Sequence, residues 1–218
     1  MAPPAVSWMN DGLWQVRVMV ERLVDRVFTS LPFRKAYHFI GGLALFLLTL
    51  FLGDTAFFIA CALYLLAFLA FGKRVSFAVI GVASLFAITR SRFATLGAIV
   101  IFTLGDGLSA IMGSCYGKRR LPWSAQKSIA GSVAFLAGAI IGTFIFVSCA
   151  SPVTGWERAL LVGLPSVTGC IAESLPITVI RDRRPDDNLI IILVSGLTLR
   201  VLMALLAIPE PSFLKMAR

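Results

Sequence analysis

An acidic residue stands in the middle of a long apolar run. Asp106 lies in the stretch Phe102–Gly113, FTLGDGLSAIMG, with a glycine on each side. A charge at the centre of a bilayer costs about 2.5 kcal/mol or more, and each flanking glycine weakens a helix by about 1 kcal/mol relative to alanine. Both costs are explained if the helix breaks here and lines a polar cavity, where irregular backbone is tolerated. The alternative is an ion pair between Asp106 and a basic residue of another helix.

The segment that follows, Gly113–Ser132, combines glycines with basic residues and hydroxyls. Glycine lets backbone N–H groups approach an anion, a lysine adds a point charge, and a helix N-terminus adds a partial positive charge. We expect this segment to hold a polyphosphate, although it is not a Walker A loop because the pattern GxxxxGK[ST] is absent. The alternative is an ordinary basic loop on the cytoplasmic side of a membrane.

Two further groups of polar residues stand at the ends of apolar runs. Asp186, Asp187 and Asn188 directly precede the last run, where they suit either a hard cation such as Mg²⁺ or the capping of a helix. Arg34 and His38 are four residues apart and therefore share a helix face at the start of the first run. They either face phosphate groups or reach toward the membrane interface.

These groups together predict one pocket that faces the cytoplasm and has a floor within the membrane. Glu173, a second acid inside an apolar run, and Lys35, beside Arg34, are further candidates for it. Carboxylates would bind a divalent cation, and basic side chains with backbone amides would bind phosphates. A soluble anionic nucleotide that meets a lipid substrate fits such a place.

The elements that must position these residues are membrane-spanning helices. The chain has 218 residues, of which 58% are hydrophobic and 14% charged, against roughly 25% charged in soluble domains, and its mean hydropathy is +0.90. We predict an all-α, polytopic integral membrane protein. About seven transmembrane helices are expected over residues 38–53, 55–72, 75–89, 93–116, 128–150, 157–178 and 188–208.

The first 33 residues predict a separate element. Val16, Val20, Leu23, Val24 and Val27 recur at helical spacing, with charged residues on the other face. This pattern is typical of an amphipathic helix that lies on the membrane surface. We therefore expect residues 1–33 to form an interfacial helix and residues 34–218 to form the transmembrane domain.

The formal net charge of +9 follows the topology rather than a nucleic-acid partner. Most basic clusters fall between apolar runs on one side, which is typical of the cytoplasmic side, and they place the N-terminus inside. Arg90 and Arg92 fall on the far side and are exceptions. Nucleic-acid binding is not expected, because no basic helix carries interleaved aromatic residues.

The motifs resemble those of the CTP-dependent lipid-alcohol kinases, a family that includes dolichol kinase, phytol kinase and the yeast-type diacylglycerol kinase. The resemblance spans roughly residues 34–196 and has four blocks in the family's order. The matching residues are Arg34, Lys35 and His38; Gly105, Asp106, Gly113, Gly117 and Lys118; Lys127, Ser128, Gly131 and Ser132; and Glu173, Pro176, Asp186, Asp187 and Asn188.

The resemblance implies transfer of the γ-phosphoryl group of CTP to a membrane alcohol, with Mg²⁺ or another divalent cation as cofactor. It assigns catalytic roles to Asp106, Glu173, Asp187 and His38, and metal binding to Asp106, Asp186 and Asp187. The residues it assigns to nucleotide binding are Arg34, Lys35, Gly113, Gly117, Lys118, Lys127, Ser128, Gly131, Ser132 and Asn188.

Three positions depart from the family's pattern. Gln126 replaces a lysine, Ser109 replaces a small alanine, and Ala130 replaces a glutamate. If that glutamate binds metal or orients the lysine in relatives, its absence would slow this enzyme, change its donor or inactivate it.

Two other functions would use some of the same residues. A CDP-lipid-forming cytidylyltransferase would use the same nucleotide and cation, but the PGHGG type of signature is missing. A small membrane transporter would also use an intramembrane acid in a glycine-rich helix, but no inverted repeat is visible. CTP as the donor rests on the resemblance alone. The sequence specifies neither the lipid alcohol that is phosphorylated nor the oligomeric state.

Overall fold

A computed structural model describes residues 31–71, 77–175 and 187–215 of the chain. The predicted interfacial helix over residues 1–33 lies almost entirely outside them. The described residues from Phe39 onward form one compact unit.

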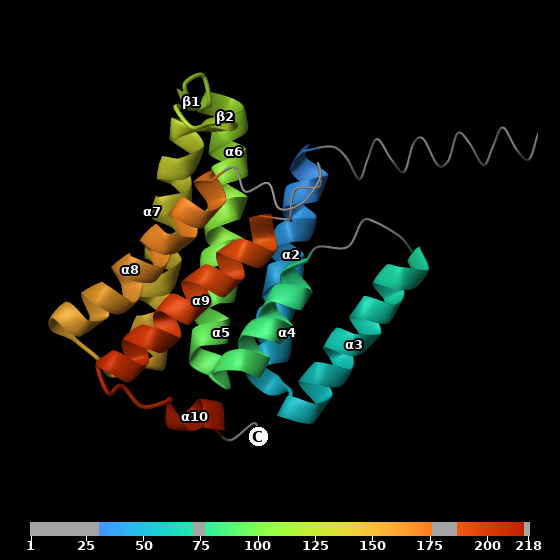
Figure 1. The fold of residues 1–218 in the computed structure, drawn as a ribbon, viewed down its shortest axis with the longest axis vertical. Helices are drawn as coiled ribbons and strands as arrows, with labels where there is room; N and C mark the ends of the chain where they lie inside the picture. Colours follow the sequence, from blue (N-terminus) through green and yellow to red (C-terminus); the bar gives the residue numbers. More distant parts are fainter. Residues whose placement is uncertain (1–30, 72–76, 176–186, 216–218) are drawn as a thin grey trace, which may run out of the picture. The chain divides into compact units, whose positions relative to one another are not determined.

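The described chain is mostly helical (Figure 1). The elements in order are α2 (Leu31–Phe51), α3 (Asp54–Phe71), α4 (Ala78–Thr89), α5 (Arg92–Val100), a π-helix η1 (Ile101–Asp106), α6 (Gly107–Tyr116), β1 (Arg120–Leu121), β2 (Ser124–Ser128), α7 (Ile129–Ala150), α8 (Gly155–Ser174), α9 (Asp187–Leu205) and α10 (Ser212–Lys215). Each of the seven predicted apolar runs coincides with one or more of these helices.

Three helical segments are long and apolar enough to cross a membrane within the described residues: Arg92–Tyr116, Ile129–Ala150 and Asn188–Leu205. The first has 25 residues, which corresponds to roughly 37 Å at 1.5 Å per residue, against a hydrocarbon core of about 30 Å. These segments support a polytopic membrane protein. The total of seven crossings stays a prediction.

The predicted break in the helix around Asp106 was wrong. Helices α5, η1 and α6 follow one another without interruption, and the backbone at Gly107 is helical, with φ −57° and ψ −52°. The helix widens instead into a π-helix that ends at Asp106. A π-helical turn redirects the faces of the residues that follow it, and such turns are frequent at functional sites.

The segment expected to be a basic loop contains a short β-hairpin, so the fold is not entirely α-helical. Strands β1 and β2 pair in antiparallel fashion, and the amide of Ile129 donates to the carbonyl of Arg119 at 3.0 Å. The side chain of Ser128 then caps α7 by accepting from the amide of Gly131 at 3.1 Å. The hairpin therefore joins α6 directly to the start of α7.

Helix α7 packs against η1, α6 and α8, and α9 packs against α4, α5 and α8 (Figure 1). The core contains aromatic and aliphatic side chains that are fully buried, among them Phe93, Phe135, Leu161 and Leu199. Apolar side chains on the outer faces of the helices are largely exposed, such as Val133 and Ile145 on α7. An exposed apolar surface of this kind fits a protein surrounded by lipid.

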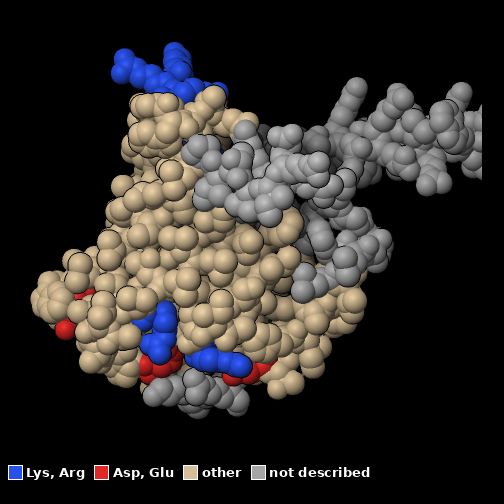
Figure 2. Space-filling model, in the orientation of Figure 1, with Lys and Arg blue, Asp and Glu red and all other residues tan. Residues whose placement is uncertain are grey.

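Charged residues gather at the two ends of this unit. On the face that Figure 2 shows, Lys and Arg side chains stand over the hairpin end, further charged side chains stand at the opposite end, and an uncharged band separates them.

Arg92, one of the two exceptions to the predicted charge pattern, begins the helix that leads to the hairpin end. It is 3% exposed and donates to Asp54 Oδ1 and to the carbonyl of Thr49, both at 2.6 Å. Its charge is therefore compensated within the protein.

Candidate functional site

A cavity of about 290 Å³ lies where α6, the hairpin and the start of α7 meet. Four of the residues predicted to bind the nucleotide line it: Gly113, Lys127, Ser128 and Gly131. The structure thus brings together the second and third sequence blocks, which are separated by the hairpin. The other lining residues are Ser109, Ala110, Ser114, Arg120 and Gln126.

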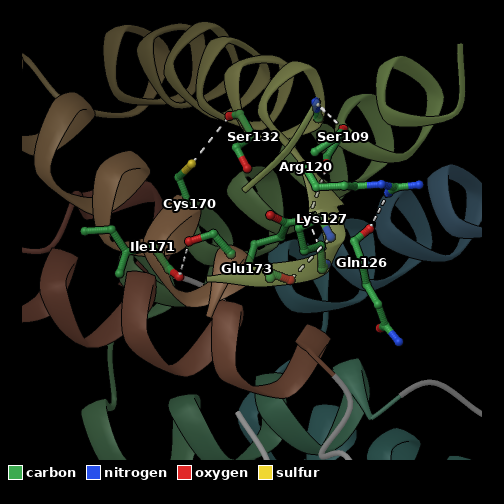
Figure 3. Close-up of polar contacts among 12 residues, drawn as sticks. Ser109, Arg120, Gln126, Lys127, Ser132, Cys170, Ile171 and Glu173 are labelled. Carbon is green, nitrogen blue, oxygen red and sulfur yellow. Dashed lines mark hydrogen bonds and ion pairs between the residues drawn. The ribbon is translucent and has the colours of Figure 1, made fainter. Parts of the chain in front are cut away.

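At the wall of the cavity, three polar side chains form a hydrogen-bonded cluster (Figure 3). Lys127 Nζ donates to Glu173 Oε1 at 2.8 Å, and Ser109 Oγ donates to the same oxygen at 3.1 Å. The side chain of Glu173 is 2% exposed and that of Lys127 is 26% exposed. A buried carboxylate is stable only when it is paired and hydrogen-bonded, so this cluster explains how Glu173 is accommodated.

The two carboxylate oxygens of Glu173 differ in their contacts. Within the described residues, Glu173 Oε2 is buried and has no hydrogen-bond partner, and the same holds for Ser132 Oγ. These atoms belong to facing helices, because Cys170 Sγ on α8 donates to the carbonyl of Ser132 on α7 at 3.4 Å (Figure 3). A buried polar atom without a partner is rare in native proteins and points to a ligand, an ion or a water molecule.

The Ser109–Glu173 contact depends on packing one helical turn earlier. A Cβ atom on Gly105 would lie 2.9 Å from Phe135 Cζ, and one on Gly169 would lie 3.5 Å from Phe135 Cε1. The fully buried ring of Phe135 therefore sits against both glycines. Since Ser109 follows Gly105 by four residues and Glu173 follows Gly169 by four, each pair shares a helix face.

A second close approach fixes α6 against the start of α7. A Cβ atom on Gly131 would lie 3.2 Å from the carbonyl oxygen of Ser109 and 3.1 Å from Ser128 Oγ. Only a residue without a side chain leaves this contact undisturbed. The predicted role of Gly131 is thus accompanied by a packing role at the wall of the cavity.

The hairpin brings one more basic group to the cavity. Arg120 Nη1 donates to the carbonyl of Gln126 at 2.8 Å, across the two strands (Figure 3). The sequence did not predict Arg120 or Ser109 as binding residues. The signal was weak, because strands of two and five residues give too short an alternation to show which side chains turn inward.

Other predicted residues lie outside the cavity lining. Lys118 is exposed, and Gly117 caps the end of α6. Asp106 is half-buried at the end of η1, three residues before Ser109. Asn188 is half-buried in the first turn of α9.

The remaining predictions concern side chains outside the described part of the chain. These are Arg34, Lys35 and His38 at the start of α2, together with Asp186 and Asp187 before and at the start of α9. The described residues contain no group of three His, Cys, Asp or Glu side chains close enough to hold a metal ion. Two of the three predicted metal ligands are outside this search, so the metal site stays a prediction.

Comparison with known proteins identifies relatives for part of the chain. It is 34% identical over 90 residues to phytol kinase 1, chloroplastic, of Arabidopsis thaliana. It is 32% identical over 105 residues to the probable chloroplastic phytol kinase 3 of Glycine max, and 39% identical over 97 residues to the probable chloroplastic phytol kinase 2 of Oryza sativa subsp. japonica. Part of this chain is thus similar to part of the phytol kinases. The similarity supports the lipid-alcohol kinase family suggested by the motifs.

The similarity to phytol kinases is partial. The matches cover 39%, 46% and 43% of this chain, and 28%, 32% and 31% of the three relatives. No protein-family model matches the chain, and no solved structure matches it.

Proposed function

We propose that this protein is a membrane-bound lipid-alcohol kinase that transfers the γ-phosphoryl group of CTP to the hydroxyl of a polyprenol, a phytol-like isoprenoid or a diacylglycerol. The observation that carries the proposal is the cavity lined by Lys127, Ser128 and Gly131, with the buried Glu173 at its wall. The relation to phytol kinases supports a kinase with an alcohol acceptor. The choice of CTP rests on the family resemblance.

Phosphoryl transfer needs positioning and charge neutralisation more than covalent chemistry. Lys127, the amides at the start of α7 and Gly113 would hold the phosphates, because the cavity combines a basic side chain with a helix N-terminus. Lys118, Gly117, Ser132 and Asn188 belong to the same proposed nucleotide site. The family resemblance also assigns Arg34, Lys35 and His38 to nucleotide binding.

Carboxylate oxygens are the ligands that Mg²⁺ prefers. We assign the ion to Asp106, Asp186 and Asp187. When bound, it would neutralise charge on the phosphate oxygens. Glu173 is the second candidate for metal binding or for accepting the proton of the acceptor hydroxyl, and its buried, unpartnered Oε2 supports such a role.

The cluster around Glu173 bears on the missing acid at position 130. Ala130 supplies no carboxylate from the first turn of α7, but Lys127 is oriented by Glu173 from α8 at 2.8 Å. An acid therefore already fixes this lysine. This arrangement supports an active enzyme in spite of the departure from the family's pattern.

The charge pattern supports a cytoplasmic site. Lys118, Arg119 and Arg120 are exposed at the hairpin end, and clusters of Lys and Arg are typical of the cytoplasmic side. We propose that the N-terminus and the cavity face the cytoplasm and that the acceptor's apolar chain enters from the membrane.

The test is an assay of the purified full chain in lipid vesicles, with γ-labelled CTP, ATP, GTP or UTP and with a panel of lipid alcohols. We expect label on the lipid with at least one alcohol, and loss of that label in Asp106→Ala with normal membrane insertion. Glu157→Ala is the matched control, since it also removes a carboxylate, from the first turn of α8, and Glu157 has no role in the proposed site. Label that appears in pyrophosphate, with the α-phosphate on the lipid, would indicate a cytidylyltransferase. Wild-type activity in Asp106→Ala would refute the role of Asp106.

A further inference from the structure

Two of the described residues that line the cavity carry a charge, Arg120 and Lys127. They differ in how that charge is compensated. This difference decides which of the two supplies net positive charge to an anionic ligand.

Lys127 forms a neutral unit with Glu173. The two side chains are 2.8 Å apart, and the carboxylate is 2% exposed. Breaking one side of a buried ion pair is strongly unfavourable, because it leaves a charge uncompensated in a poorly solvated place. Lys127 therefore cannot leave Glu173 to neutralise an anion at low cost, and an anion beside it also faces the nearby carboxylate.

Among the described residues, no acidic side chain pairs with Arg120. Its guanidinium donates from Nη1 to the carbonyl of Gln126 at 2.8 Å. That bond orients the group across the hairpin, and no carboxylate of the described residues compensates its charge. A guanidinium presents several donors in a rigid plane and binds phosphate oxygens through two bonds at once.

We propose that Arg120 is the principal anion-binding residue of the cavity, and that Lys127 and Glu173 act as a neutral pair that positions the ligand. The ligand class is a polyphosphate, and only this choice of class rests on the proposed function. This pairing predicts that losing an acidic side chain raises the affinity for an anion. Removing the charge of Glu173 would release the charge of Lys127 toward the cavity and strengthen the binding of an anion.

The experiment measures the binding of inorganic tripolyphosphate to the purified full chain in detergent, by calorimetry, in the presence of EDTA. Under these conditions no divalent cation, nucleotide or lipid acceptor contributes. We expect Arg120→Gln to weaken binding about tenfold or more, the loss typical of a charge-assisted contact. Arg119→Gln is the matched control, because it removes the same charge from an exposed neighbour that does not line the cavity, and it should change the affinity less than about twofold.

Glu173→Gln provides the second arm of the experiment. It keeps the shape of the side chain and should tighten tripolyphosphate binding about threefold or more, because one negative charge is removed beside Lys127. Equal effects of Arg120→Gln and Arg119→Gln would overturn the proposal. Weaker binding to Glu173→Gln, or no binding to the wild-type protein, would also overturn it.

The two proposals can fail separately. If the wild-type protein binds tripolyphosphate with the expected pattern but phosphorylates no lipid, the kinase function fails and the role of Arg120 stands. If lipid phosphate forms but Arg120→Gln binds tripolyphosphate as the wild type does, the kinase function stands and the role of Arg120 fails.

Discussion

Ser109 and Glu173, which are 64 residues apart in the chain, are joined by a buried hydrogen bond of 3.1 Å between their side chains. The bond links α6, which runs up to the hairpin, to the last turn of α8. It ends on the oxygen that also accepts from Lys127. Side chains from the regions of the second, third and fourth sequence blocks thus meet at one carboxylate oxygen.

The first prediction concerns this bond. Ser109→Ala removes one of the two donors to a buried carboxylate, which should lower the free energy of unfolding by about 1–3 kcal/mol. The melting temperature in detergent should fall by a few degrees. Ser114→Ala is the control, since the exposed hydroxyl of Ser114 makes its contacts within its own helix, to the carbonyl of Ile111 at 2.7 Å and to Cys115 Sγ at 3.9 Å. Equal losses in the two variants would contradict a special role for Ser109.

The second prediction is an asymmetry within the ion pair. Lys127→Met leaves a carboxylate that is 2% exposed without its cation, and removing one partner of a buried pair costs about 3–5 kcal/mol. Glu173→Gln leaves a lysine that is 26% exposed and that water can reach, and the amide oxygen still accepts hydrogen bonds. We expect Lys127→Met to lose clearly more stability, as measured by unfolding in mixed micelles. A larger loss in Glu173→Gln would be inconsistent with this picture.

The third prediction tests the packing of Gly105 against Phe135, which positions Ser109. Gly105→Ala places a Cβ atom 2.9 Å from Phe135 Cζ, so a buried ring must move, at a cost of about 1–3 kcal/mol. Because Ser109 lies one turn further along the same face, lipid phosphorylation should fall as well. Gly163→Ala is the matched control on α8, where a new Cβ atom would meet nothing within 4 Å. That variant should be neutral or more stable by about 0.5–1 kcal/mol. The idea fails if both variants melt at the same temperature.

The fourth prediction concerns the opposite end of the unit. Asp54→Asn removes the charge that compensates the buried Arg92. The loss should stay below the about 3–5 kcal/mol of a fully buried pair, because Asp54 is 32% exposed and Arg92 keeps its bond to the carbonyl of Thr49. Activity per folded molecule should be unchanged, because Arg92 begins the helical segment Arg92–Tyr116 and the cavity lies at the other end of that segment. Arg200→Gln, at an exposed position of α9, is the control and should leave the melting temperature unchanged. A loss of activity without a loss of stability would count against a purely structural role.

Some of the site could be predicted from residue order alone. Apolar runs of membrane length give the helices, because each must satisfy its backbone hydrogen bonds internally. The glycines, lysine and serine after Asp106 indicated an anion site, and Gly113, Lys127, Ser128 and Gly131 indeed line one cavity. These residues were predictable because their chemistry is local: they lie within 19 positions of one another, on either side of a single turn.

Other features depended on which helix faces meet. Gly105 and Gly107 suggested a broken helix, but the helix continues through a π-helix. Gly105 instead leaves space for the ring of Phe135. The pairing of Glu173 with Lys127 and Ser109, the orientation of Arg120 by the hairpin, and the compensation of Arg92 by Asp54 join residues that no local pattern connects. The sequence by itself determined the apolar helices and the chemical types available at the cavity. Only the tertiary structure decided which charges neutralise one another, because electrostatic pairing depends on distances across helices that spacing along one chain does not specify.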